Sequence, residues 1–184
     1  MGQLDGKVAI VTGGGSGIGK GIAKAFADEG CSVVIAARNA ERLNAAAAEL
    51  SRDGATIVAI PTDVTEEDQV ISLFAKMMDQ FGRLDVLVNN SGAFDGGPVE
   101  DLTMEQWQKV IQVNVTGPFL GSREAFKIMK KQGGGRIINV GSIAAQKPRH
   151  SSSPYTTSKH AVWGLTQSLA LEGRDHGIAV SALH

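Results

Sequence analysis

The side chains best suited to chemistry are a tyrosine and a lysine four residues apart, Tyr155 and Lys159. In a segment with helical character, this spacing places both side chains on one face, one turn apart. A tyrosine hydroxyl can donate a proton to an oxygen that is becoming negative. A lysine ammonium about 4 Å away stabilises the resulting phenolate by roughly 4 kcal/mol at an effective dielectric constant of about 20. The pair therefore indicates general acid–base chemistry at Tyr155.

Two polar residues upstream could complete such a centre. Ser142 follows a β-branched run at 136–140, at a point where a parallel sheet presents groups to ligands. Its hydroxyl could donate a hydrogen bond to a substrate oxygen. Asn114 lies in a β-branched run that ends at Gly117 and Pro118, which indicates an interruption of a helix.

A glycine-rich turn from Thr12 to Gly19 follows the first strand-like run and precedes a helical pattern. Glycines let the backbone approach a pyrophosphate closely, and the free N–H groups at a helix start favour negative charge. The turn does not fit the G-x-G-x-x-G spacing. Residues 14–20 fit a nucleotide-triphosphatase P-loop, but Gly21 stands where a hydroxyl must hold magnesium, so a P-loop phosphotransferase is an alternative that Gly21 disfavours.

Short β-branched runs alternate with helical segments along the whole chain, which is typical of parallel strands joined by right-handed crossovers. The runs are 8–11, 33–35, 56–60, 86–88, 136–140 and 178–180. The sequence therefore predicts an α/β fold with a doubly wound parallel sheet, as a single domain over residues 1–184, with ligands at the carboxyl ends of the strands.

Three further expectations concern helix starts and the chain end. Thr65 with Asp68, and Thr103 with Gln106, each have the spacing of a capping box at a helix start. The last apolar run stops at His184 with nothing after it to cover the strand. We therefore expect the C-terminal part of the fold to be missing from this chain.

Composition excludes several classes of partner. The 18 basic and 19 acidic residues give a net charge of -1, so the positive field of a nucleic-acid-binding protein is absent. No apolar run is long enough to span a bilayer, and we expect no membrane role. The chain has one cysteine and therefore no internal disulfide, which fits a reducing, cytoplasmic location. The histidines show no metal-ligand spacing, so no metal site is expected.

The motifs together resemble the short-chain dehydrogenase/reductase family. Residues 12–19 match its T-G-x-x-x-G-x-G pattern, and residues 89–92 read N-N-S-G, which is similar to the family's N-N-A-G with Ser91 in place of alanine. The resemblance implies a Rossmann-like fold and a catalytic tetrad of Asn114, Ser142, Tyr155 and Lys159. It implies that Asn114 holds a water in a proton relay and that Lys159 also binds the nicotinamide ribose. The cofactor-binding residues that we expect are Gly13, Ser16, Gly17, Ile18, Gly19, Arg38, Asn39, Asp63, Val64, Asn90, Ser91, Gly92, Tyr155 and Lys159.

The end of the second strand-like run indicates which cofactor is preferred. A fold that selects NAD usually carries an acidic residue there, but this chain has Ala37 followed by Arg38. A guanidinium can take a 2′-phosphate through paired hydrogen bonds. We therefore expect NADP(H), with NAD as a possible substitute.

The expected activity is hydride transfer between NADP(H) and a carbonyl or secondary alcohol, such as a 3-oxoacyl thioester, a sugar, a steroid or another ketone. The alternative is a non-catalytic member of the same fold that senses a dinucleotide or binds a partner protein. The resemblance also implies a homodimer or homotetramer that packs through helices near 117–131 and 155–175.

Overall fold

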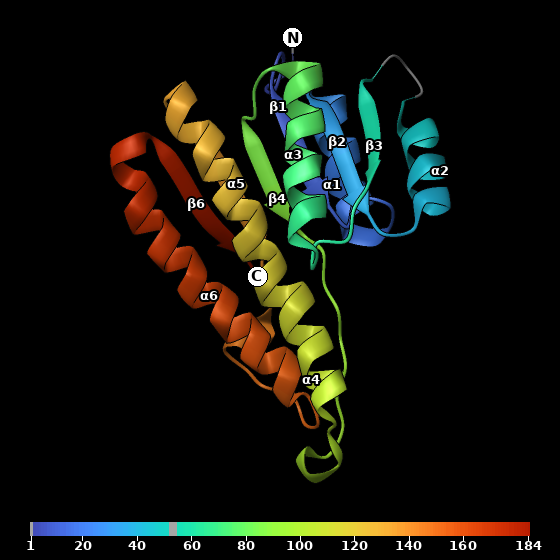
Figure 1. The fold of residues 1–184 in the computed structure, drawn as a ribbon, viewed down its shortest axis with the longest axis vertical. Coiled ribbons are helices and arrows are strands. Elements are labelled where there is room, and N and C mark those ends of the chain that lie inside the picture. Colours follow the sequence, from blue (N-terminus) through green and yellow to red (C-terminus); the bar gives the residue numbers. More distant parts are fainter. Residues whose placement is uncertain (1, 52–54) are drawn as a thin grey trace.

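The computed structural model of the protein describes residues 2–51 and 55–184 (Figure 1). Within these ranges six strands form one parallel sheet in the order β3-β2-β1-β4-β5-β6. The strands are β1 (Val8–Thr12), β2 (Ser32–Ala37), β3 (Ile57–Pro61), β4 (Val86–Asn89), β5 (Gly135–Val140) and β6 (Ile178–Leu183). Each coincides with a predicted run, which confirms the doubly wound parallel sheet in a single domain.

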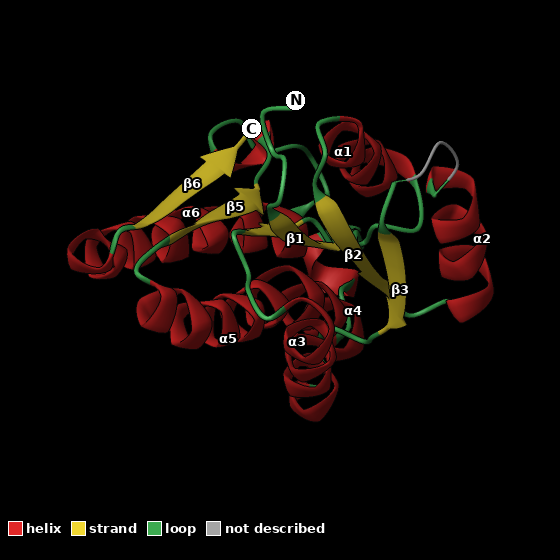
Figure 2. Ribbon diagram, turned by 90° about the horizontal axis from the view of Figure 1, so that it is seen from above, coloured by secondary structure: helices red, strands yellow, loops and turns green. Residues whose placement is uncertain are grey.

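Helices cover both faces of the sheet (Figure 2). On one face lie α1 (Gly17–Asp28) and α2 (Ala40–Leu50), and on the other lie α3 (Glu67–Phe81), α5 (Gly117–Gln132) and α6 (Ser153–Gly173). The short helix α4 (Met104–Ile111) stands beyond the carboxyl ends of the strands together with the start of α6 (Figure 1). Among the described residues no helix is long and apolar enough to cross a membrane.

The central strands are apolar at every position because both of their faces are covered. All five residues of β1 are buried. Ile10 packs into the apolar layer on the α3 and α5 face, whereas its neighbours Ala9 and Val11 pack into the layer on the α1 and α2 face. The period of two along a strand thus divides one continuous apolar run between two cores.

One predicted helix start is confirmed and the other is wrong. Thr103 caps α4 in a capping box, with its side chain accepting from the Gln106 N–H and the Gln106 side chain accepting from the Thr103 N–H. Helix α3, however, begins after Glu66, because the N–H and the hydroxyl of Thr65 both donate to the Asp63 carboxylate, at 3.0 and 2.8 Å. An ionised oxygen two residues away is the stronger acceptor, and it takes the hydroxyl that would have capped the helix.

A buried polar chain joins the sheet to the helices on the α3 and α5 face. Asn89 at the end of β4 donates through Nδ2 to Asn139 Oδ1 on β5, at 2.8 Å, and to Ser122 Oγ on α5, at 3.1 Å. Asn139 donates in turn to Thr166 Oγ1 on α6, at 2.9 Å. These groups are buried, so leaving one unpaired would cost about 1–3 kcal/mol. This series of hydrogen bonds therefore fixes how α6 lies over the carboxyl ends of β4 and β5.

Candidate active site

The turn between β1 and α1 is packed so closely that two of its positions require glycine. Gly13 has φ +67°, in the left-handed region. A Cβ on Gly19 would collide with the carbonyl oxygen of Gly13 and with the side-chain amide of Asn90. Ser16 is the N-cap of α1 but its side chain makes no capping hydrogen bond. The turn therefore offers a closely approachable backbone at a helix start, as a phosphate group requires.

The ends of β1 and β4 are held together by side chains. The Thr12 hydroxyl accepts from the N–H groups of Asn90 and Ser91, both at 3.0 Å. Asn90 Nδ2 donates to the carbonyl of Thr12 at 2.9 Å. Asn90 was predicted to contact the cofactor through its backbone, and the structure shows that its side chain holds the glycine turn in place. Sequence reasoning gave Thr12 no such role, because its partners lie far away along the chain.

A cavity of about 320 Å³ opens beside this joint, at the carboxyl ends of β1, β2 and β3. The predicted cofactor residues among its walls are Gly13, Ser16, Arg38, Asn39, Asp63, Val64, Ser91 and Gly92. Gly17, Ile18, Gly19, Asn90, Tyr155 and Lys159 are not among the residues that line it. The structure adds Gly15, Ala37, Arg42, Leu43, Thr62 and Val113 to the predicted set.

Two arginines stand at the edge of the cavity. Arg38 is largely exposed and its guanidinium lies 3.9 Å from the Asp63 carboxylate, a separation at which the contact is weak. Asn39 caps α2 by accepting from the Arg42 N–H at 2.8 Å, which places Arg42 in the first turn of that helix. The spacing of four residues between the two arginines was a signal in the sequence that could have identified Arg42.

Tyr155 and Lys159 share one face of α6, as their spacing predicted. Lys159 is buried, and its Nζ lies 5.5 Å from the centroid of the Tyr155 ring. The same Nζ donates to the carbonyl of Val140 at the end of β5, at 2.9 Å. Burial lowers the pKa of Lys159 from its ordinary value, because the charged form is removed from water. The ammonium is thus held between the catalytic candidate and the sheet.

Asn114 lies in a π-helical turn, η3 (Gln112–Thr116), which confirms the predicted interruption. Its Oδ1 accepts from the Ala93 N–H at 2.7 Å, and its Nδ2 donates to the Ala93 carbonyl at 2.9 Å. Nδ2 also donates to Ser158 Oγ at 3.0 Å, and that hydroxyl donates to the Tyr155 carbonyl at 2.7 Å. Asn114 therefore connects the chain after β4 to the turn of α6 that carries Tyr155.

Ser142 follows β5 and begins the short helical turn η4 (Ile143–Ala145), which packs against α6. Its Oγ accepts from the Ala144 N–H at 3.1 Å, which leaves the hydroxyl proton available for another acceptor. The structure thus places the Lys159 ammonium beside the Tyr155 ring and links Asn114 to the Tyr155 backbone through the Ser158 hydroxyl. It places Ser142 on the adjoining turn. A proton donor, a buried cation and a hydroxyl therefore gather at the carboxyl edge of the sheet.

The model of the short chain dehydrogenase family matches residues 7–184. The chain belongs to this family. The protein is therefore a short-chain dehydrogenase/reductase, an oxidoreductase that acts on CH–OH or C=O groups.

Relatives and solved structures agree with this assignment. The uncharacterized oxidoreductase YxjF of Bacillus subtilis is 44% identical over 177 residues, which are 96% of this chain and 69% of that protein. A 3beta-hydroxysteroid dehydrogenase of Mediterraneibacter gnavus is 39% identical over 184 residues, which are 100% of this chain and 66% of that protein. A variant of actinorhodin polyketide ketoreductase, crystallised with NADPH, superposes with a TM-score of 0.94 at 37% identity, covering 99% of this chain and 70% of that one.

The two glycines Gly19 and Gly21 of α1 offer a matched test of the turn. Gly19→Ala should lower the free energy of unfolding by about 1–3 kcal/mol and weaken dinucleotide binding, because its Cβ collides with the turn. Gly21→Ala meets open space and should raise stability by about 0.5–1 kcal/mol through helix propensity. Urea unfolding of both variants measures the difference, and equal effects would contradict the close packing.

A buried ammonium at Lys159 predicts a pH-dependent stability. Because its folded pKa is lowered, the native state releases this proton at a lower pH than the unfolded chain does. Stability then rises with pH from the folded pKa of Lys159 up to its unfolded pKa, by at most about 1.4 kcal/mol per pH unit. The unfolding free energy of the wild type should therefore increase relative to that of Lys159→Met as the pH rises towards the ordinary lysine pKa of 10.5. The exposed Lys131→Met is the control, and a parallel trend for both variants would refute the prediction.

Proposed function

We propose that this short-chain dehydrogenase/reductase transfers hydride between NADP(H) and a carbonyl or secondary alcohol, with Tyr155 as the acid and base. The observation that carries the proposal is the continuity between the dinucleotide cavity and Tyr155. Gly92 and Val113 line the cavity, and their chain neighbours Ala93 and Asn114 are hydrogen-bonded to each other. Asn114 in turn bonds the α6 turn that begins at Tyr155.

The residues present fit a nicotinamide dinucleotide. The glycine turn is packed so closely that Cβ atoms on Gly13 and Gly19 would collide with neighbouring atoms, which keeps the backbone at the start of α1 open to a pyrophosphate. The arginines at the cavity edge supply positive charge for a 2′-phosphate. When bound, the cofactor supplies or accepts the hydride. The NADPH named with the similar ketoreductase structure supports the same preference. NAD is the alternative cofactor, because Arg38 is exposed to water and does not need a 2′-phosphate to neutralise its charge.

Each catalytic side chain has its own proposed role. Tyr155 donates its phenolic proton to the substrate oxygen during reduction and takes it back during oxidation. The Lys159 ammonium stabilises the phenolate, and in the complex it binds the nicotinamide ribose. Ser142 donates its free hydroxyl proton to the substrate oxygen. Both side-chain amide protons of Asn114 are already donated within the protein. A relay water would therefore donate its hydrogen bond to an oxygen atom of Asn114.

We further propose that the protein works in the cytoplasm as a homodimer or homotetramer. Large apolar side chains are exposed on the helices that the family resemblance assigned to the interface, namely Phe119 on α5 and Trp163 and Leu171 on α6. Burying such side chains between copies removes apolar surface from water.

Removal of the phenolic hydroxyl tests the activity. Tyr155→Phe should lower kcat for ketone reduction by about 100-fold to 10,000-fold, the range that a positioned general acid contributes. NADPH binding should be largely retained, because Tyr155 does not line the cavity. Turnover is followed by the absorbance of the reduced nicotinamide with several ketones. Activity close to that of the wild type would overturn the assignment, whereas tight cofactor binding without any wild-type turnover would favour the sensing alternative.

Fluorescence titration with NADPH and NADH tests the phosphate preference. Arg38→Ala should weaken NADPH binding by roughly 10-fold to 100-fold, the loss of one or two charge-assisted hydrogen bonds, and leave NADH binding nearly unchanged. Arg42→Ala should act in the same direction. Arg136→Ala is the control, because Arg136 is exposed at the start of strand β5 and does not line the cavity. A wild type that binds NADH more tightly than NADPH would sink the prediction.

A further inference from the structure

The chain segment after β4 brings an exposed aromatic ring to the catalytic candidate. We call residues 92–98 the Phe94 loop. The Phe94 side chain is 64% exposed, yet its ring meets the Tyr155 ring edge-on, with centroids 5.3 Å apart and planes at 61°. A substrate that reaches the phenol of Tyr155 from this side passes the Phe94 ring. The position of that ring therefore bears on which substrates fit.

The residue after Phe94 ties the loop to α4. Asp95 Oδ1 accepts from Gln106 Nε2, and Oδ2 accepts from Lys109 Nζ, both at 3.0 Å. Oδ1 also accepts from the Gly96 N–H at 3.0 Å. The hydrogen bonds from Lys109 and Gln106 hold the pKa of Asp95 below its usual range. The carboxylate thus stays charged and bonded to one helix from two positions.

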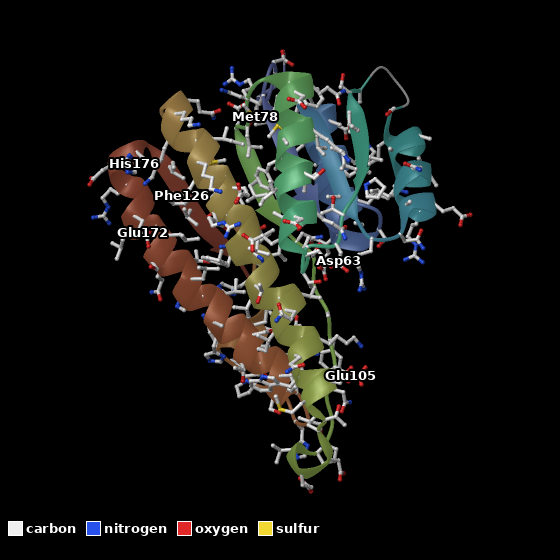
Figure 3. All side chains as sticks on the ribbon, in the orientation of Figure 1. Asp63, Met78, Glu105, Phe126, Glu172 and His176 are labelled. Carbon is white, nitrogen blue, oxygen red and sulfur yellow. The ribbon has the colours of Figure 1, made fainter. Side chains whose placement is uncertain are left out.

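The capping box of α4 orients one of these partners. Gln106 Oε1 accepts from the N–H and the hydroxyl of Thr103, at 3.0 and 3.1 Å. With its oxygen held in this way, the opposite end of the amide presents Nε2 to Asp95. Figure 1 shows α4 standing beside the loop and the start of α6, and Figure 3 labels Glu105 on the same helix. The T-x-x-Q motif therefore caps α4 and also orients the Gln106 amide towards Asp95.

The other end of the loop is fixed to the segment that leads into α6. Gly97 donates its N–H to the Ser151 carbonyl at 3.0 Å. A Cβ on Gly96 would collide with that same carbonyl oxygen. Ser151 itself has φ +55°, a left-handed conformation that costs a residue other than glycine some strain. Phe94 is thus closely followed by two anchored residues, because Asp95 is bonded to α4 and Gly97 to the segment before α6.

We propose that Asp95 is a positioning residue: through Gln106 and Lys109 it holds Phe94 against Tyr155 as an apolar wall of the substrate site. The wall favours carbonyl compounds that carry an apolar or aromatic group next to the carbonyl, because such groups pack on an aromatic face and edge. Asp95 touches neither the substrate nor the cofactor and acts only through Phe94. This inference rests on the proposed function of Tyr155.

Substrate discrimination is the first test. Wild type, Asp95→Ala and Asp95→Asn are compared on a phenyl ketone and on a small aliphatic ketone with NADPH. Asp95→Ala should raise KM for the phenyl ketone by about 10-fold, which is the scale of one lost apolar contact. The value of kcat and the KM for the small ketone should change little. Asp95→Asn keeps the acceptor for Gln106, so its KM for the phenyl ketone should lie between the values of the wild type and Asp95→Ala. Asp101→Asn, an exposed carboxylate in the neighbouring turn η2 (Val99–Asp101), should match the wild type.

A double-mutant cycle separates this role from a general loss of structure. Lys109→Met removes the second partner of Asp95, so its effect on KM for the phenyl ketone should vanish in the Asp95→Ala background. Additive effects of the two substitutions would show that they do not act through one contact. Equal losses on both ketones, accompanied by reduced unfolding stability, would mean that Asp95 only supports the fold and would overturn the proposal.

The single tyrosine of the chain allows a test that needs no turnover. Protein labelled with a fluorinated tyrosine should give one fluorine NMR signal, which reports the environment of Tyr155. Asp95→Ala should move this signal towards its position in Phe94→Ala, while Asp101→Asn leaves it in place. If the wild type reduces no ketone but the signal moves, the proposed function fails and the positioning contact stands. A signal that is unmoved by Asp95→Ala refutes the positioning role itself.

Discussion

The joint between the carboxyl ends of β1 and β4 is the constraint on which the site depends. At this point the strand order reverses, so the chain leaves the two neighbouring strands in opposite directions and opens a crevice. Thr12 and Asn90 close the joint by exchanging hydrogen bonds between backbone and side chain. Without these hydrogen bonds, the glycine turn and the segment after β4 would not be held in fixed positions relative to each other. Residues that follow both of these strand ends, among them Gly13 and Gly92, line the dinucleotide cavity.

From this joint the backbone after β4 and then a series of hydrogen bonds lead to α6. Ala93, four residues beyond the end of β4, is bonded on both backbone groups by Asn114, and Asn114 bonds the turn of α6 that holds Tyr155. Below this path, the buried amides of Asn89 and Asn139 lock α6 to the sheet. Helix α6 is therefore positioned at two levels, one near its start and one in its middle. Such double support is what a site needs when its reacting groups must be placed to within a fraction of an ångström.

The sequence predicted what depends on local pattern and missed what depends on distant contacts. The strands, the glycine turn, the Thr103 cap and the break around Asn114 follow from residue types a few positions apart, and the structure agrees with them. Asp63 took the hydroxyl of Thr65, a competition that the capping-box spacing does not reveal. The side chain of Asn90 turned to the glycine turn, and Phe94 met Tyr155 across a long stretch of sequence. Contacts of this kind appear only once the fold brings the segments together.

The buried ammonium of Lys159 has a consequence for evolution and engineering. A charge held away from water costs free energy. The buried Lys159 therefore lowers the net free energy of unfolding that the apolar layers provide. A search for heat-resistant variants that scores stability alone would tend to replace this lysine with an apolar residue, and so remove the ammonium that we propose supports Tyr155. Gains have to come from positions remote from α6, such as the exposed face of α2, where added helix propensity leaves the centre untouched.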